Sequence, residues 1–285
     1  MLDRSVIRLV WFFSVGPVWL APATLTSAQS PADQHVKVEL ISEQDAIVPH
    51  SKIWVGIRFD LQDEWHTYWV NPGDSGEPPR IEWELPLGFQ AGAIQWPYPV
   101  RLSTPPFVDF GYEHQVLLIA AVQPSQALRE GVSQRIEARV HYLVCRDVCI
   151  PGQKQLELTL PVKSRAVAGS DVQLFEATRR RLPQPAPESW KISAASLGDD
   201  FVLNLIIGGS AGAPQFFPSE EEQIENAAPQ TATTIPGGFR LHLKKSKHLL
   251  KPLSRLRGVL VVGSGKAYRV DVPVLPSSRN VPTQS

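Results

Sequence analysis

The sequence predicts an all-β protein, and three observations support this class. Apolar residues make up 43% of the 285 residues, yet they occur mostly in short runs. Those runs are interrupted at close intervals by 26 prolines and 19 glycines, which are the usual turn residues between strands. Within several runs the apolar residues alternate with polar ones, which is the period of a β-strand and not that of a helix. We therefore expect many short strands joined by turns.

The first 28 residues have the character of a secretory signal peptide. Arg4 and Arg8 give a positive start, residues 9–20 are apolar, and residues 26–28 (Thr-Ser-Ala) provide a small-residue cleavage site. The alternative is an uncleaved membrane anchor, but the apolar run is about 12 residues with a proline inside, whereas a spanning helix needs about 20. We expect residues 1–28 to be removed and the mature chain to be exported without stable membrane insertion, into a compartment where disulfides persist.

The charge balance argues against several classes of ligand. The chain has 28 lysines and arginines and 28 aspartates and glutamates, so its formal net charge is zero. A neutral chain has no electrostatic reason to bind nucleic acid or an anionic membrane. No phosphate-binding loop, paired-carboxylate site or Ser-His-Asp arrangement stands out. We therefore expect no cofactor, no metal and no nucleic-acid partner.

Residues 32–165 are predicted to form the first domain. Alternation of apolar and polar residues marks five clear strands within it, and the spacing of turn residues leaves room for others. Six or more short strands over this length is the count expected of an immunoglobulin-like β-sandwich. The five clear strands are residues 35–42, 51–61, 114–122, 134–144 and 155–162.

A helix and a linker are expected next, over residues 166–189. Ser170 is a suitable N-cap, and Leu174, Phe175, Thr178 and Leu182 form one stripe at helical spacing. The sequence "PQPAPES", residues 183–189, is typical of a linker. Residues 190–275 are then predicted to form a second, smaller β-rich domain, with its clearest hairpin over 258–274, and residues 276–285 a disordered tail.

Cys145 and Cys149 are the two cysteines of the chain. The strand before them places even-numbered residues from Ile136 to Val144 toward the core, so Cys145 falls on the opposite face. In a straight strand the two cysteines would be about 13 Å apart, at roughly 3.3 Å per residue. A disulfide needs Cα atoms within about 7 Å of each other. If the two cysteines pair, the chain must therefore turn sharply through residues 146–148, at a strand end or hairpin tip.

The residues alone leave three interpretations of this pair open. A short disulfide loop constrains the unfolded chain little, which argues against a purely structural role. A redox pair is the second interpretation; Arg146 would favour a thiolate at Cys145, whereas Asp147 would oppose it, so which thiol attacks stays open. A metal site that includes His141 is the third, although no second Cys/His cluster completes a structural zinc site.

Several motifs together resemble a known family. The segment "YLVCRDVCIPG", with "WHTYWVNPGDSGEPP", "IQWPYPVRL" and "FVDFGYEHQVLL" before it, is similar to the periplasmic N-terminal domain of the thiol:disulfide interchange protein DsbD. It is more similar still to the related copper-sensitivity suppressor ScsB, which carries a second β unit. Here "APQFFPSEEEQIENAAPQ" and "GVLVV…YRVDVPV" resemble that second unit, so the resemblance covers residues 35–275.

The resemblance implies that the Cys145/Cys149 pair cycles between dithiol and disulfide. Electrons would come from a separate membrane electron-donor protein and pass to periplasmic thioredoxin-like oxidoreductases. The protein would then act in the periplasm, as a component of protein-disulfide reduction. The alternative is a non-redox β-sandwich that binds a protein partner and carries a structural disulfide.

The same resemblance implies an aromatic cap loop over the cysteines. Its counterpart here is Asp109, Phe110, Gly111 and Tyr112, with Phe110 as the candidate shield. This sequence departs from the family pattern in having only three residues between the cysteines, fewer than in the best-known DsbD domain. Trp65, His66, Tyr68 and Trp69 are expected to pack beneath a long loop, and His66 and His114 are weaker candidates for proton carriers near the thiols.

Overall fold

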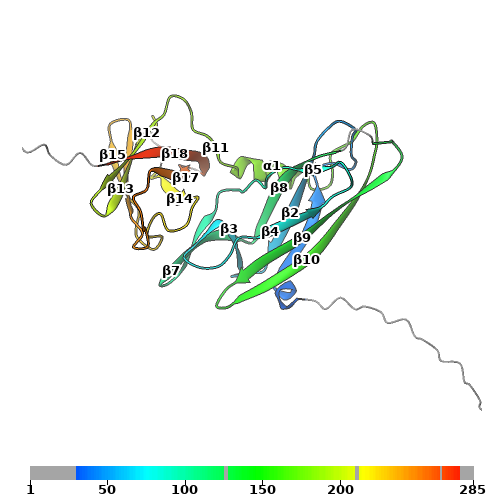
Figure 1. The fold of residues 1–285 in the computed structure, drawn as a ribbon, viewed down its shortest axis with the longest axis horizontal. Helices are drawn as coiled ribbons and strands as arrows, with labels where there is room; N and C mark the ends of the chain where they lie inside the picture. The colour runs from blue at the N-terminus through cyan, green and yellow to red at the C-terminus, as the bar shows by residue number, and fades with distance from the viewer. Residues whose placement is uncertain (1–29, 125–127, 209–211, 264, 277–285) are drawn as a thin grey trace, which may run out of the picture.

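The computed structural model describes residues 30–124, 128–208, 212–263 and 265–276. It contains two β units joined by helix α1 (Figure 1). The all-β prediction is confirmed, since strands make up most of the described chain. The predicted signal peptide (1–28) and all but Pro276 of the predicted tail lie outside the described residues.

The N-terminal unit is a sandwich of two antiparallel sheets, preceded by a short 3₁₀ turn at Pro31–Gln34. The first sheet has the order β1 (Val36–Ser42), β2 (Ile53–Leu61), β8 (Gln115–Gln123) and β5 (Gln90–Ala91). The second has the order β10 (Cys149–Pro161), β9 (Ser133–Cys145), β3 (His66–Gly73), β7 (Phe107–Glu113) and β6 (Val100–Thr104), with β4 (Arg80–Glu84) paired to β9.

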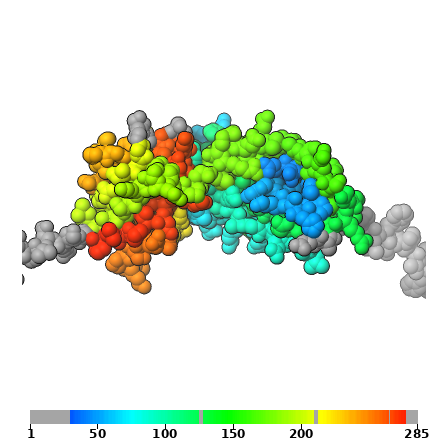
Figure 2. Space-filling view, turned by 90° about the horizontal axis from the view of Figure 1, so that it is seen from above, coloured from blue at the N-terminus to red at the C-terminus, as the bar shows by residue number. Residues whose placement is uncertain are grey.

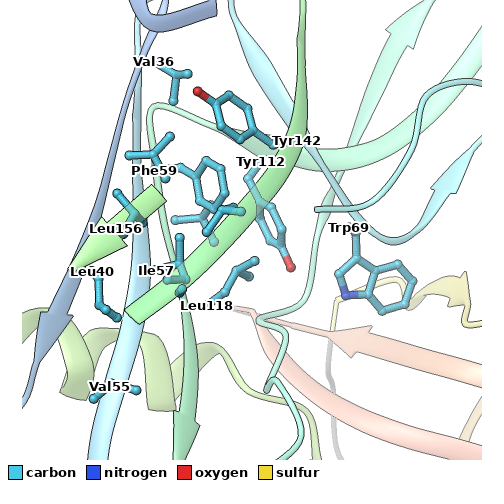
Figure 3. Close-up of a cluster of buried hydrophobic side chains, with 14 of the residues drawn as sticks. Val36, Leu40, Val55, Ile57, Phe59, Trp69, Tyr112, Leu118, Tyr142 and Leu156 are labelled. Carbon is cyan, nitrogen blue, oxygen red and sulfur yellow. The ribbon is translucent and has the colours of Figure 1, made fainter. Parts of the chain in front are cut away.

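The core of the sandwich lies between the two sheets (Figure 3). Phe59 from β2 and Leu118 from β8 meet Tyr112 from β7 and Tyr142 from β9. The predicted alternation along β9 is confirmed, because its even-numbered residues are all buried in this core. They are Ile136, Ala138, Val140, Tyr142 and Val144.

Helix α1 (Val172–Arg181) follows the sandwich and begins one residue later than expected. Its N-cap is Asp171 and not Ser170, because the first helical hydrogen bond runs from the Phe175 N–H to the Asp171 carbonyl. The Ser170 hydroxyl instead donates to the Asp171 carboxylate at 2.8 Å. In the predicted stripe, Phe175 and Thr178 are buried, and Leu174, Phe175 and Leu182 belong to a cluster with Leu117 and Ile119 of β8.

The C-terminal unit is built from β11 to β18. Its strands lie in the order β14 (Gln215–Pro218), β17 (Arg255–Val262), β18 (Lys266–Pro276), β12 (Lys191–Leu197), β13 (Asp200–Ile206), β16 (Gly238–Lys244) and β15 (Thr231–Ile235). β17 and β18 form the predicted hairpin. β11 (Gln184–Pro185), within the segment expected to be a linker, pairs in parallel with β18.

The two units are in contact, and Figure 2 shows the C-terminal one (yellow-green to red) against the N-terminal one (blue to green). Phe217 of β14 packs edge-on against Phe110, with ring centroids 5.4 Å apart, and against Trp69 at 6.4 Å. Val259 and Ala267 join the same apolar cluster. The contact therefore continues the core of the sandwich, which keeps the second sheet and the C-terminal unit in a defined relation.

Candidate redox site

The two cysteines form a disulfide at the tip of the β9–β10 hairpin. Cys145 is the last residue of β9 and Cys149 the first of β10, and the two are direct partners in the ladder. Their Cα atoms are 4.1 Å apart, and the S–S distance is 2.07 Å. The Arg146 N–H donates to the Val148 carbonyl at 3.2 Å, which closes the turn between them. The prediction that the pair lies within disulfide reach at a hairpin tip is confirmed.

Two other strands, β3 and β7, bring side chains to the same face of the sheet as Cys145. His66 of β3 is the ladder partner of Cys145, and Tyr68 follows two residues along the same strand. Tyr68 is in turn opposite Gly111 of β7, so Asp109, two residues before it, shares this face. Directly paired residues point to the same side of a sheet. The disulfide therefore lies on the outer face, away from the core.

A hollow of about 290 Å³ opens at the disulfide. The hairpin tip, β3, the segment after β3, the turn before β7 and β7 itself contribute its walls. The lining residues are His66, Tyr68, Ser75, Thr104, Pro105, Phe107, Asp109, Cys145, Arg146, Asp147 and Cys149.

Tyr68 places its hydroxyl group against both sulfur atoms. Its hydroxyl donates to Cys145 Sγ at 2.9 Å and lies 3.5 Å from Cys149 Sγ. The side chain is fully buried, and burial, with a smaller effect of the nearby Asp109 carboxylate, raises the pKa of Tyr68 to about 12. The hydroxyl thus stays protonated at neutral pH and is a permanent hydrogen-bond donor to sulfur. The sequence predicted only a packing role for Tyr68. The signal for its place at the sulfurs is that Tyr68 lies two residues after His66, the ladder partner of Cys145, and so shares its face of the sheet.

Two buried ionisable side chains, His66 and Asp109, also line the hollow. Asp109 is 3% exposed and accepts hydrogen bonds from the Ser75 N–H at 2.8 Å and the Ser75 hydroxyl at 2.9 Å. Burial raises the pKa of its carboxyl. The His66 imidazole lies edge-on to the Tyr68 ring, and its Nε2 has no hydrogen-bond partner within the described parts of the chain. Burial lowers the pKa of His66, so its neutral form is favoured.

The two sulfurs differ in accessibility. Cys145 is 2% exposed, whereas Cys149 lies at the surface. The guanidinium group of Arg146, which the sequence placed as a neighbour favouring the Cys145 thiolate, is paired with Asp147 at 2.9 Å and Glu64 at 3.6 Å. It also lies over the Trp65 ring. An incoming sulfur therefore meets Cys149 first, and the Arg146 charge is already balanced by carboxylates.

The structure does not bring Phe110 to the cysteines, which corrects the predicted shield. Phe110 is fully buried in the core against Phe217, because alternation along β7 points Val108, Phe110 and Tyr112 inward. The residues of β7 that reach the hollow are Asp109 and the half-exposed Phe107. Of the four predicted cap residues, Asp109 is therefore the one that lines the hollow. Gly111 lies within the β3–β7 ladder.

The remaining histidine candidates lie elsewhere. His114 is 77% exposed, with Nδ1 at 3.8 Å from the Asp63 carboxylate. His141 pairs with Gln153 in the β9–β10 ladder, and its Nε2 is 3.9 Å from Glu82. Over the described ranges, no three His, Cys, Asp or Glu side chains are grouped in a way that could hold a metal ion.

This combination of fold and site defines a class. A β-sandwich that presents one buried and one exposed cysteine at a hairpin tip, beneath a tyrosine hydroxyl, is arranged for thiol–disulfide interchange. Residues 37–161 match the model of the family described as thiol:disulfide interchange protein DsbD, N-terminal. This part of the chain, which holds both cysteines, is a domain of that family.

One solved structure in particular supports the assignment of the fold. The N-terminal periplasmic domain of ScsB from Proteus mirabilis matches with a TM-score of 0.66 at 15% identity, over 87% of this chain and 96% of that one. The reduced DsbD N-terminal domain of Neisseria meningitidis also matches, over 49% of this chain and 94% of that one, at 13% identity and a TM-score of 0.27. A search of curated proteins finds no match. Within the described residues, no helix has both the length and the apolar character needed to cross a membrane.

Proposed function

We propose that the protein is a reductant relay, which takes electrons from a membrane electron-donor protein and passes them through Cys145 and Cys149 to thioredoxin-like oxidoreductases in the periplasm. The observation that carries the proposal is the asymmetric pair itself. An exposed Cys149 is available to a partner, while the buried Cys145 sulfur accepts a hydrogen bond from Tyr68. The membership of residues 37–161 in the DsbD N-terminal family supports it.

Reduction of the relay would begin at Cys149. A thiolate of the donor attacks Cys149 Sγ, the Cys145–Cys149 bond breaks, and its electron pair leaves on Cys145 as a thiolate. The Tyr68 hydroxyl is placed to stabilise that developing negative charge. A second thiolate of the donor then attacks the donor sulfur of the mixed disulfide. This step releases Cys149 as a thiolate and leaves the donor oxidised.

Delivery of the electrons is the reverse sequence with another partner. The Cys149 thiolate attacks a disulfide of the oxidoreductase, and one sulfur of that disulfide leaves with the electron pair. The Cys145 thiolate then attacks Cys149 Sγ, which restores the intramolecular disulfide and releases the partner with both of its cysteines reduced. In this scheme Cys149 attacks and Cys145 resolves, the opposite of the preference suggested by the position of Arg146 in the sequence.

The test is to trap the mixed disulfide. The mature protein, as wild type and as Cys145→Ala and Cys149→Ala, is produced with export to the periplasm of a bacterial host and analysed on non-reducing gels. Cys145→Ala removes the resolving thiol, so we expect it to accumulate mixed-disulfide adducts that disappear when dithiothreitol reduces them. Cys149→Ala and the double variant should form far fewer adducts.

A structural disulfide predicts a different pattern. Neither single variant would then form a thiol-sensitive adduct. The reduction potential of the wild-type disulfide would lie below about −300 mV, as is typical of structural disulfides. That result would replace the relay with the protein-binding alternative.

A further inference from the structure

The segment that leaves β3 is attached to the C-terminal unit. Asn71, which is 1% exposed, donates from Nδ2 to the Pro218 carbonyl at 2.8 Å and to the Glu220 carbonyl at 3.1 Å. Its Oδ1 accepts from the Gly73 N–H at 3.0 Å. Residues 71–76, called the covering segment below, are thus fixed at their start by a buried amide that bridges the two units.

Asp74 provides a second attachment within the covering segment. One of its carboxylate oxygens accepts from Asn226 Nδ2 of the C-terminal unit at 2.9 Å, and the other accepts from the Val108 N–H of β7 at 2.8 Å. The Asp74 N–H donates to the Val108 carbonyl at 3.1 Å. Asn226 is itself 5% exposed, and its backbone carbonyl accepts from Arg101 at 2.6 Å. The covering segment is therefore held between β7 and Asn226.

The covering segment also forms one wall of the cysteine hollow. Ser75 donates twice to Asp109, and Gly76 packs on the Tyr68 ring. A Cβ atom added at Gly76 would lie 2.1 Å from Tyr68 Cζ, so the backbone there is in direct contact with the ring. Gly76 adopts φ of +81°, a conformation that favours glycine. The position of the Tyr68 hydroxyl on Cys145 Sγ thus depends on where this backbone lies.

We propose that Asn226 is a positioning residue for thiol–disulfide exchange, and that the C-terminal unit tunes the disulfide although it contributes no sulfur to it. Asn226 holds Asp74, and Asp74 holds the segment that packs on Tyr68. Tyr68 in turn donates to the sulfur that leaves when the disulfide is reduced. The biological meaning of this chain of contacts rests on the proposed relay, but its physical effect can be measured with a small thiol.

The test compares three variants with the wild-type mature protein, all with intact disulfides. Asn226→Leu removes the hydrogen bond to Asp74 at similar volume and without adding charge. The double variant Asp74→Asn/Asn226→Asp restores a hydrogen bond with the donor and acceptor exchanged, at unchanged net charge. Asn204→Leu is the matched control, because the Asn204 side chain accepts a hydrogen bond from Arg240 elsewhere in the C-terminal unit.

The readouts are the rate of reduction by dithiothreitol and the reduction potential, both measured well below the thermal transition. We expect Asn226→Leu to slow reduction by about threefold or more and to make the potential more negative, because the Cys145 thiolate loses support from Tyr68. The double variant should return both values toward wild type, and Asn204→Leu should leave them unchanged.

Two results would overturn the proposal. In the first, Asn226→Leu lowers the melting temperature but leaves rate and potential at wild-type values, which is a structural role alone. In the second, the double variant recovers the wild-type melting temperature, which indicates that the hydrogen bond is restored, but its rate of reduction stays as slow as that of Asn226→Leu. Failure of the relay itself would appear separately, as an absence of trapped adducts from Cys145→Ala while the dithiothreitol rates still respond to Asn226.

Discussion

The Tyr68 hydroxyl donates a hydrogen bond to Cys145 Sγ at 2.9 Å, across 77 positions of sequence. This contact joins β3, in the middle of the second sheet, to the tip of the β9–β10 hairpin. A hydrogen bond to sulfur stabilises a thiolate more than it stabilises a disulfide, since hydrogen bonds to charged groups are the stronger ones. The redox properties of the pair should therefore respond to changes at Tyr68.

Tyr68→Phe should slow reduction by dithiothreitol by about fivefold, the equivalent of about 1 kcal/mol for one hydrogen bond. The Cys145 thiol should also have a higher pKa in the reduced variant. Stopped-flow reduction and thiolate absorbance would measure the two effects. Tyr112→Phe is the matched control. The buried Tyr112 hydroxyl donates to the Pro97 carbonyl at 2.7 Å, on the core side of the sheet and not at the disulfide. Equal rates for the Tyr68 variant and wild type would rule out this role.

Alkylation of the reduced protein should distinguish the two thiols. Cys149 lies at the surface and Cys145 is 2% exposed, so we expect iodoacetamide to modify Cys149 on the order of tenfold faster. Peptide mass spectrometry at short times would give the two rates. The same measurement in urea should remove most of the difference. Faster labelling of Cys145 in the folded protein would contradict the order of attack that we propose.

Stability should depend on pH through His66. Burial lowers its pKa in the folded state, so the unfolded chain binds its proton more readily. The resulting contribution of His66 to the free energy of unfolding is fully present above about pH 6.5, the usual pKa of an unfolded histidine. It is lost as the pH falls below that value toward the lower pKa of the folded state. Stability should therefore decline between pH 7 and pH 5, values chosen to bracket the usual histidine pKa.

The variant His66→Phe should reduce this decline in stability. Urea unfolding at the two pH values would measure it. His114→Asn is a suitable control, because His114 is 77% exposed and its φ of 58° is one that asparagine tolerates. A decline in His66→Phe as steep as in wild type would assign the pH dependence to other groups.

Phe107 is our candidate for the shield that the sequence placed at Phe110. The Phe107 side chain is 50% exposed and lines the cysteine hollow. Phe107→Ala should therefore increase the rate of reduction by glutathione by roughly twofold or more, since access to sulfur limits that attack. Phe110→Leu should instead lower stability by less than about 1.5 kcal/mol and leave the rate unchanged. The opposite pattern would restore Phe110 as the shield.

Strand alternation explains how much of the fold could be predicted. The alternation of apolar residues within one strand predicts which of its faces is buried. The inward face of β9 and the outward position of Cys145 could therefore be predicted from the local sequence. The need for a sharp turn between the cysteines followed from chain geometry alone. The all-β class could be predicted because it requires only that many such strands be recognised along the chain.

The rest depends on pairings that no local pattern encodes. Phe107 and Phe110 differ by an odd number of positions, and which of them reaches the sulfurs is set by the register of β7 on β3. That register shifts at an irregularity between Tyr68 and Gly73. The hydrogen bonds from Asn71 and Asn226 join residues 147 to 152 positions apart. Single-sequence patterns carry no information on contacts of that range.

The ladder of the β9–β10 hairpin has a consequence for the energetics of electron transfer. It runs without interruption from the Ser133–Pro161 pair to the Cys145–Cys149 pair, so backbone hydrogen bonds hold the two strands together whether or not the sulfurs are bonded. After reduction the thiols should stay near each other at a high effective concentration. Ring closure then needs little reorganisation of the chain, and the protein can change oxidation state repeatedly without refolding.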